Sequence, residues 1–485
     1  MIHSPFSFTS HLTLLADTNS PDPAHHDVST GTTLLFAAIL VLMIVALAFE
    51  EKLHAKKSII TGVFAAVSLL LAAAFELLPF APLKHILAVN NLPFGEKIEM
   101  PVFIEAIDWN VITIIFGAGL FVDVTSKSGI FSWIAIKVTK ASGGDPLKLL
   151  IYYGAMTVLF SAMLNNVTAM IIVGSLTVVS LNKLHRNELL LGFLVAEGLL
   201  TNVGGLLTLI SSVPNIIVGN IAGISFVKFF LVAAPFVVVC TAVTLWMSKV
   251  IFKIKSLQSD QKRKEAAALV AAFDENDGIE SRRFFNFCAV IGLLFVVALS
   301  SQSVLPLADK LGMGFVAMTF AAIVLVAFKH EVNKFYSAVD WDLLGFFACL
   351  FVVINVMEHA QVLAALGKGI SALVAFGDLV GPAGLTAGSA VASSVTDNIP
   401  LAAMLAKILA AESTDPKSSL WWCVIFGANL GGNITPIGSA STVVAVTIIH
   451  KHKLKLSFGG FVKTAAPFAA VQIVLAIIYV LLFLR

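Results

Sequence analysis

The sequence has few charged residues and few cysteines. Asp, Glu, Lys and Arg make up 12% of the 485 residues, about half the usual share of a soluble globular protein. The formal net charge of +2 leaves no basic face for phosphates, so nucleic acid is excluded as a partner. The four cysteines lie inside apolar runs without a CxxC pair, which excludes a disulfide framework and a zinc site: Cys240, Cys288, Cys349 and Cys423.

The sequence is instead rich in apolar residues. They make up 58% of the chain and occur in long runs, and a membrane helix needs about 20 of them. The sequence therefore predicts an all-α polytopic membrane protein, surrounded by lipid, with a polar N-terminal tail at 1–30. The ten predicted crossings are roughly 31–49, 58–79, 109–126, 189–222, 226–250, 284–302, 313–329, 341–357, 420–448 and 460–484.

Two further apolar stretches, 149–182 and 362–411, are interrupted by polar residues at their middles. Asn165-Asn166 interrupts the first and Thr396-Asp397-Asn398 the second. Backbone outside a helix is tolerated at membrane depth only beside protein or a cavity. We therefore predict two re-entrant helical hairpins with polar tips, with two complete spans in each stretch as the alternative.

The basic residues predict the orientation. If the N-terminus is outside, the inside segments hold 23 of the 31 Lys and Arg residues, as the positive-inside rule requires. Both termini are then outside, and the mixed-charge segment 253–283 is a cytoplasmic linker containing a solvated helix. The membrane is expected to be a bacterial inner membrane or its equivalent.

The chain has an internal repeat, 31–252 and 284–485, on either side of this linker. Asp108 and Asn165 are 57 residues apart, and so are Asp340 and Asp397, so the two hairpin tips correspond. Five crossings in each half make the second half inverted relative to the first. Two further pairs of segments match in the same order: Asn202–Thr208 with Asn429–Thr435, and Ser225-Phe226 with Ser457-Phe458.

Two glycine pairs, Gly204-Gly205 and Gly431-Gly432, lie inside the apolar stretches 189–222 and 420–448. Each glycine costs a helix about 1 kcal/mol, so we predict two broken helices, although close helix packing is an alternative reason for the glycines. Inverted repeats with broken helices are typical of secondary transporters, which bind substrate between the repeats. The predicted ion- and substrate-binding residues are Asn165, Asn166, Thr168, Asn202, Gly204, Gly205, Thr208, Ser211, Ser212, Asn215, Thr396, Asp397, Asn398, Asn429, Gly431, Gly432, Asn433, Thr435, Ser439 and Ser441.

These residues suit either sign of ion. Unwound carbonyls and amide oxygens suit Na⁺, whereas helix N-termini suit an anion. Bound Na⁺ is expected, if anywhere, at Asn165, Asn166, Asp397 and Asn398, and no other cofactor is predicted.

Two acids within the apolar stretches, Asp397 and Glu197, are the proton-coupling candidates. Asp397 has the alternative role of helix N-cap. Glu197 has the alternative role of pairing with a hairpin amide or with Lys407.

At these motifs the chain resembles the ArsB/NhaD branch of the ion-transporter superfamily, which includes arsenite permeases, sodium/proton antiporters and the melanosomal P protein. The resemblance is strongest at 160–168, 196–205, 397–400 and 427–441. It implies that the protein is a homodimer. More distantly, the two tips resemble those of the dicarboxylate/sodium symporters, which implies that Asn165-Asn166-Val167 and Asp397-Asn398-Ile399 hold substrate and sodium. In two places, acidic residues of the family are replaced by neutral ones: Asn165 at the first tip and Ser212 within Ser211–Asn215.

Several functions remain open at this point. The leading hypothesis is sodium/proton antiport by alternating access, with Asp397 as the titrating group. The main alternative is sodium- or potential-coupled transport of an anion such as arsenite, a carboxylate or another oxyanion. A passive ion channel is a further alternative. No enzyme is expected, because the sequence has no HExxH or GxSxG motif.

Overall fold

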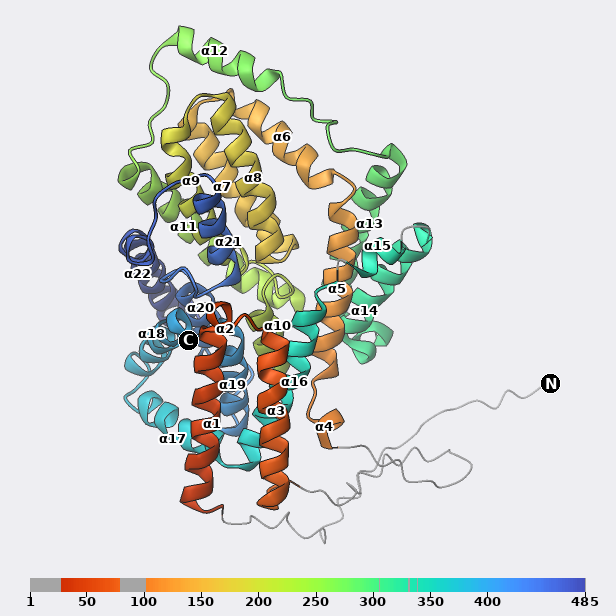
Figure 1. Cartoon of the computed structure of the whole chain (residues 1–485), viewed down its shortest axis with the longest axis vertical. Helices are drawn as coiled ribbons and strands as arrows, with labels where there is room; N and C mark the ends of the chain where they lie inside the picture. Colours follow the sequence, from red (N-terminus) through yellow and green to blue (C-terminus); the bar gives the residue numbers. More distant parts are fainter. Residues whose placement is uncertain (1–27, 79–101, 305, 330–331, 338, 485) are drawn as a thin grey trace, which may run out of the picture.

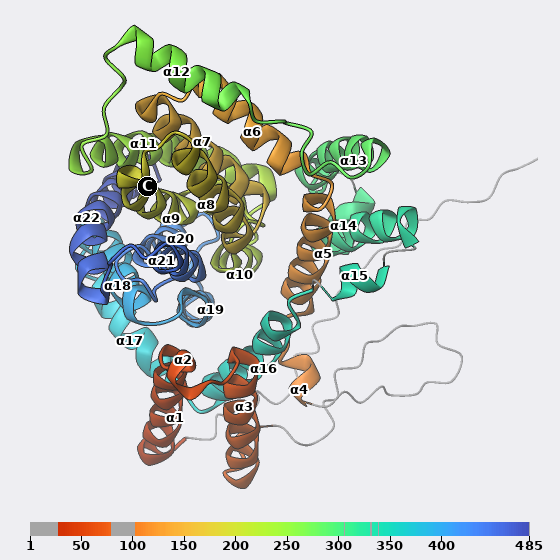
Figure 2. The same cartoon turned by 45° about the horizontal axis from the view of Figure 1, so that its top comes forward.

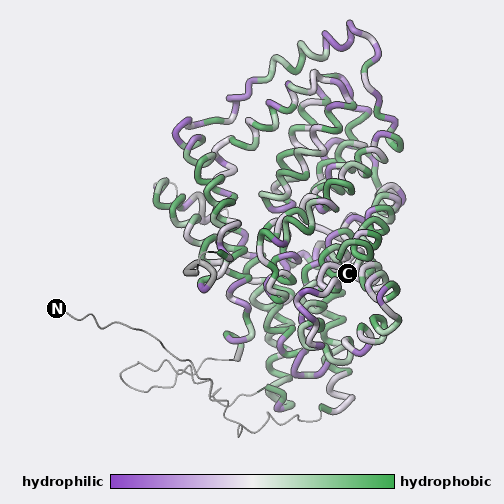
Figure 3. The backbone as a smooth tube through the Cα atoms, turned by 180° about the vertical axis from the view of Figure 1, so that it is seen from behind, coloured by the Kyte–Doolittle hydropathy of each residue, from purple (hydrophilic) through white to green (hydrophobic). Residues whose placement is uncertain are grey.

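The computed structural model describes residues 28–78, 102–304, 306–329, 332–337 and 339–484, and these residues form helices and connecting turns without a strand (Figure 1). Ten of the helices are long and apolar enough to cross a membrane. The prediction of an all-α membrane protein is therefore confirmed. The ten helices differ from the ten predicted crossings, because they include both arms of the first predicted hairpin and no helix of 189–222 or 420–448. Most of the predicted tail 1–30 lies outside the described residues. Hydrophobic residues run along the helices, and hydrophilic ones concentrate in the linker (Figure 3).

The hairpins and the broken helices pack into one group, which we call the hairpin bundle (Figures 1 and 2). It comprises α7 (Pro146–Met163), α8 (Asn166–Lys183), α9 (Leu190–Gly204), α10 (Val213–Ile221), α11 (Phe226–Ile251), α18 (Val380–Val395), α19 (Asn398–Ala411), α20 (Leu420–Gly431), α21 (Ala440–Lys451) and α22 (Phe458–Phe483).

A peripheral group flanks this bundle (Figure 2). In it α5 packs on α14 and α3 packs on α16. The group comprises α1 (Thr30–Ala48), α3 (Lys57–Ala74), α5 (Trp109–Ser126), α13 (Arg282–Ser301), α14 (Pro306–Ala327) and α16 (Trp341–His359). Shorter helices connect these elements: α2 (Glu50–Leu53), α4 (Val102–Glu105), α6 (Ile130–Ser142), η1 (Asn187–Leu189), α12 (Asp260–Ala271), α15 (Val332–Tyr336) and α17 (Val362–Val374).

The first hairpin is α7–α8, and its turn carries Asn165 as N-cap of α8. Each arm has 18 residues and is apolar enough to be counted among the ten candidate spans. The second stretch differs from the predicted 362–411, because it holds three helices rather than two arms. Gly377, with φ +103°, lies between α17 and α18, a conformation that only glycine adopts without strain. The second hairpin is therefore α18–α19.

The helix interruptions lie where the glycine pairs predict them. Helix α9 ends at Gly204 and α10 begins at Val213, while α20 ends at Gly431 and α21 begins at Ala440. All residues of α9 except Leu191 are buried, and α20 is almost as completely enclosed. The two interrupted helices thus form the centre of the hairpin bundle.

Close packing also requires the first glycine of each pair. A Cβ atom on Gly431 would lie 2.2 Å from the carbonyl oxygen of Ala390 in α18, and one on Gly204 would lie 2.7 Å from Cα of Val158 in α7. The predicted alternative, helix packing, is therefore a second reason for these glycines. Each interrupted helix is pressed against the first arm of its own hairpin.

Several helices of the two halves match in order and length. Helices α6 and α17 both have 13 residues and precede the hairpins, and α11 and α22 both have 26 residues. Internal prolines, Pro235 and Pro467, lie at matching places in the last pair. Inversion of the second half across a membrane stays a prediction.

The linker between the halves is fixed to the first hairpin. Asp145, the N-cap of α7, accepts hydrogen bonds from the hydroxyl of Ser256 (2.5 Å) and the N–H of Leu257 (2.8 Å). Burial would raise the pKa of Asp145, but these bonds and those from its own helix hold it below the usual value. Helix α12 follows within the predicted linker, and the cytoplasmic position of that linker stays a prediction.

The packing of Gly431 leads to the first testable prediction. Gly431→Ala should destabilise the protein by about 1–3 kcal/mol, because the new methyl group meets backbone that cannot move aside. Gly388→Ala in α18 is the matched control, since nothing lies within 4 Å of its Cβ position. Thermal unfolding of the detergent-purified variants measures both. Equal melting temperatures for the two variants would contradict the packing described here.

Candidate functional site

A buried network of amides and hydroxyls joins the two interrupted helices. The Asn202 amide donates to Oδ1 of Asn433 and to Oγ of Ser439, both at 2.8 Å. We call the set the amide network. Its residues are all buried, and it consists of Asn202, Ser212, Asn215, Asn429, Asn433, Ser439 and Ser441.

The network exchanges bonds between the halves in a reciprocal way. Asn202 at the end of α9 bonds to Ser439 at the start of α21, and Ser212 at the start of α10 donates to Asn429 of α20 at 2.7 Å. Asn429 in turn donates to Oδ1 of Asn215 (2.9 Å). Each interrupted helix therefore holds the other in place.

Hydroxyl groups fasten each hairpin to its own interrupted helix in matching pairs. Thr208 donates to the carbonyl of Ala162 (2.7 Å), and Thr435 donates to that of Ser394 (2.6 Å). Both acceptors lie near the ends of the first hairpin arms, where carbonyls lack helical partners. In the opposite direction, Ser161 and Ser393 donate to carbonyls of α9 and α20, both at 2.6 Å.

The glycine pairs and their neighbours complete the two breaks. The carbonyl of Gly205 accepts bonds from Ser211 and from Asn215, both at 2.6 Å. A Cβ atom on Gly205 would lie 2.8 Å from Asn166, and one on Gly432 would lie 3.0 Å from Gly438. A larger residue at Gly205 would therefore displace the first tip, and one at Gly432 would displace the loop of the second break.

The first tip adjoins the amide network through Asn166, whereas Asn165 lies outside it. Asn166 donates to Oδ1 of Asn202 (3.3 Å) and accepts from Ser161 (2.7 Å). Asn165 is exposed and caps α8 by accepting from the N–H of Thr168 (2.8 Å). Three helices, α8, α10 and α21, consequently begin at residues of this network or directly beside it.

The second tip faces the peripheral group instead. Oδ2 of Asp397 accepts from the Lys57 ammonium at 2.5 Å, while Oδ1 caps α19 through the N–H of Ile399. The N-cap alternative for Asp397 is thus observed, together with an ion pair that the sequence did not predict. Thr396 donates within its own helix, and Asn398 is buried beside it.

Lys57 is the first residue of α3. The second tip therefore lies beside the first turn of a candidate span, α3, rather than beside its middle. Among the four residues proposed for Na⁺, Asn165, Asn166 and Asp397 bond to three different sets of partners.

Glu197 lies apart from the amide network. Its Oε1 accepts from the hydroxyl of Thr177 in α8 at 2.5 Å, and its Oε2 has no hydrogen-bond partner among the described residues. The alternative pairing of Glu197 with Lys407 is wrong, because the ammonium of Lys407 pairs with Oε2 of Glu358 instead, at 3.7 Å. Glu197 therefore bonds to the first hairpin through a hydroxyl rather than an amide.

Sequence reasoning missed two residues of this region. Gln472 accepts from Asn433 (2.8 Å) and donates to Thr244 (3.0 Å), which extends the network into α22 and α11. The signal that could have identified Gln472 is its amide side chain, which stands alone in the apolar stretch 460–484. Lys57 gave no such signal, because the positive-inside rule predicts lysines at the inside end of any membrane helix.

A model of the citrate transporter family matches residues 59–427. The chain belongs to the citrate transporter family. The chain is also similar to the human P protein, a member of the predicted ArsB/NhaD branch. The two sequences are 25% identical over an alignment that covers 80% of this chain and 55% of the P protein. The predicted resemblance is therefore confirmed, and the chain is a membrane transporter.

Two other comparisons extend this assignment. An uncharacterised transporter of Mycobacterium bovis is 32% identical, over 77% of this chain and 86% of its own. Among solved structures, the MtrF antimetabolite efflux pump of Neisseria gonorrhoeae superposes with a TM-score of 0.54 at 14% identity, covering 93% of this chain and 95% of MtrF. The YdaH transporter of Alcanivorax borkumensis gives 0.52 at 12%, covering 93% and 98%. These two likenesses concern the fold alone.

The amide network leads to the second prediction. Asn429→Leu should destabilise the protein by about 1–3 kcal/mol and abolish transport, because it leaves buried polar atoms of Ser212 and Asn215 without partners. Asn182→Leu, at an exposed position of α8, is the control with the same change of side chain. Thermal unfolding and uptake into proteoliposomes measure the effects. Normal uptake by Asn429→Leu would remove the network from the transport site.

Proposed function

We propose that this transporter moves a small carboxylate anion across the membrane and couples that movement to a monovalent cation at Asp397. The observation that carries the proposal is the composition of the amide network. Its residues are amides and hydroxyls, none of them acidic, and three helices begin at or beside it. Uncharged donors and helix N-termini favour negative charge.

The start of α10 lies within the amide network. Its N-cap residue, Ser212, makes no side-chain cap bond, since Pro214 has no N–H and the N–H of Asn215 donates to the carbonyl of Ser212 (3.0 Å). The hydroxyl of Ser212 donates to Asn429. The positive end of α10 therefore faces the network without a capping side chain, and a carboxylate of a bound anion would interact favourably with that end. The family description, citrate transporter, supports this substrate class.

Sodium/proton antiport is the second candidate, and the carboxylate of Asp397 favours it. Na⁺ and a proton would compete for the same oxygens, which is the minimum that exchange requires. Against this reading, Asp397 is already paired with Lys57, and the amide network contains no second carboxylate. Anion transport assigns a role to both the amide network and Asp397, whereas antiport assigns a role to Asp397 alone.

Transport in proteoliposomes separates the two candidates. Radiolabelled citrate, a dicarboxylate and arsenite are tested for accumulation against a gradient, with imposed Na⁺ or Li⁺ gradients and a dye for internal pH. We expect accumulation of a carboxylate that depends on the cation gradient. Cation-driven proton movement without any anion would instead establish antiport, and flux that never exceeds equilibrium would establish a channel.

The third prediction concerns Asp397→Asn, which keeps the shape of the side chain and removes its charge. Under anion transport, this variant should still exchange internal for external anion but lose accumulation driven by a cation gradient. Under antiport, it should lose cation-driven proton movement. Asn165→Asp at the exposed first tip is the matched control for charge at a tip. Cation-driven accumulation unchanged in Asp397→Asn would contradict the coupling role.

A further inference from the structure

An ion pair links the hairpin bundle to the peripheral group. Lys57 begins α3, which packs on α16, whereas Asp397 caps α19 at the second hairpin tip. Their charged atoms are 2.5 Å apart, and the two side chains are only 27% and 13% exposed. A pair this enclosed is little screened by solvent, so its formation or loss changes how the two helix groups are held together.

Further acidic side chains lie near this pair. Glu50 lies 3.9 Å from the Lys57 ammonium. Asp342, at the start of α16, accepts from both the hydroxyl (2.5 Å) and the N–H (3.2 Å) of Ser58, the residue next to Lys57. Two carboxylates, those of Glu50 and Asp397, therefore lie within 4 Å of one ammonium, and Asp342 is bonded to its neighbour, which makes the place attractive to a further cation.

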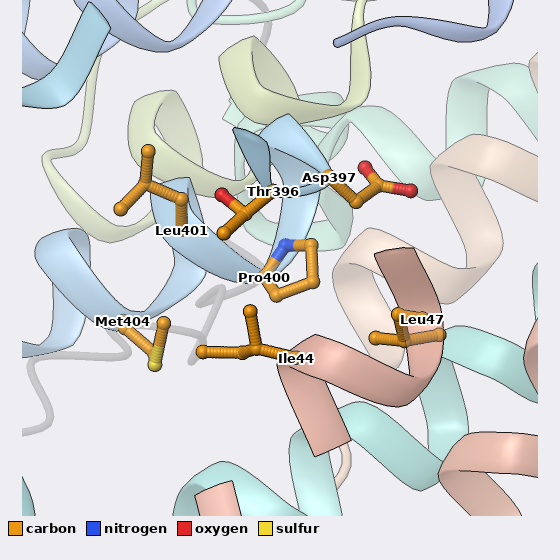
Figure 4. Close-up of a pocket in the computed structure, with 7 residues that line it drawn as sticks. All are labelled: Ile44, Leu47, Thr396, Asp397, Pro400, Leu401 and Met404. Carbon is orange, nitrogen blue, oxygen red and sulfur yellow. The ribbon is translucent and has the colours of Figure 1, made fainter. Parts of the chain in front are cut away.

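A small cavity adjoins the Asp397 side of the pair. Its volume is about 10 Å³, room for about one water molecule or one dehydrated monovalent ion. Thr396 and Asp397 supply its polar lining, and Ile44 and Leu47 of α1 cover it from the peripheral group. Figure 4 shows the Asp397 carboxylate on the Leu47 side of the cavity, away from Met404.

We infer that Lys57 is a tethered cation that competes with a monovalent cation for Asp397, so that cation binding detaches the second hairpin tip from α3. Two positive charges within a few ångströms of one carboxylate repel each other. Pairing with Lys57 and binding of a cation are therefore alternatives. The inference rests on the proposed function, because it gives the cation coupling at Asp397 a structural consequence.

The test measures separation of the tip from the peripheral group directly. Leu47 is 5% exposed and lies under the tip residues. In a background with the four native cysteines replaced by alanine, Leu47→Cys is treated with a maleimide at fixed pH. We expect slow labelling in choline chloride and labelling several-fold faster in NaCl or LiCl, because the cation displaces Lys57 and the tip moves away.

The variants show whether the ion pair is responsible. Lys57→Met in the same background should label fast in every salt, whereas Lys56→Met removes an exposed lysine next to it and should behave like the parent. The charge exchange Lys57→Asp with Asp397→Lys should restore slow labelling, which also controls for a folding defect of the single variant. Labelling independent of Na⁺ and Li⁺ in the parent, or a Lys57→Met variant that behaves like Lys56→Met, overturns the inference.

The same samples separate this inference from the proposed function. Cation-dependent labelling without carboxylate uptake would keep the competition at Asp397 and refute anion transport. Cation-driven carboxylate uptake with labelling that ignores the cation would keep the function and refute the role of Lys57. Neither result is ambiguous, because labelling does not require transport and uptake does not require the added cysteine.

Discussion

A backbone group without a hydrogen-bond partner is costly inside a membrane, and the interrupted helices place several such groups at the centre of this protein. The structure satisfies them with short hydroxyl side chains that reach from one element to the next. The hydroxyls of Thr208 and Thr435 donate to carbonyls near the ends of the first hairpin arms. The hydroxyls of Ser161 and Ser393 donate to carbonyls of the interrupted helices. In each half, a hairpin and a broken helix thereby become one unit, and the amide network joins the two units.

This arrangement divides the polar residues into two places with different chemistry. The amide network is uncharged and lies where α8, α10 and α21 begin, so it suits a negatively charged substrate. Charge is concentrated at the second tip, where Asp397 meets Lys57. In the account proposed here, the first place selects the anion, and the second links the cation to the contact between the hairpin bundle and the peripheral group.

Much of this fold follows from local sequence, because glycine pairs and polar residues inside apolar stretches favour helix interruptions. Gly204, Gly431 and the two tips mark the interruptions to within a few residues. Long-range contacts leave no such trace. The helix α6 lies between the predicted apolar segments 109–126 and 149–182, and α17 lies within the stretch predicted as one hairpin. The bond of Lys57 to Asp397 joins residues from opposite halves. Only the packing of helices distant in the sequence determines these features.

The claim that the amide network receives an anion is tested most directly by a cryo-electron microscopy structure in lipid nanodiscs with saturating citrate and Na⁺. The account predicts citrate density between the first tip and the starts of α10 and α21, within hydrogen-bond distance of Ser212 or Asn166. Density for citrate elsewhere, or an unchanged network under conditions in which citrate is transported, would contradict it.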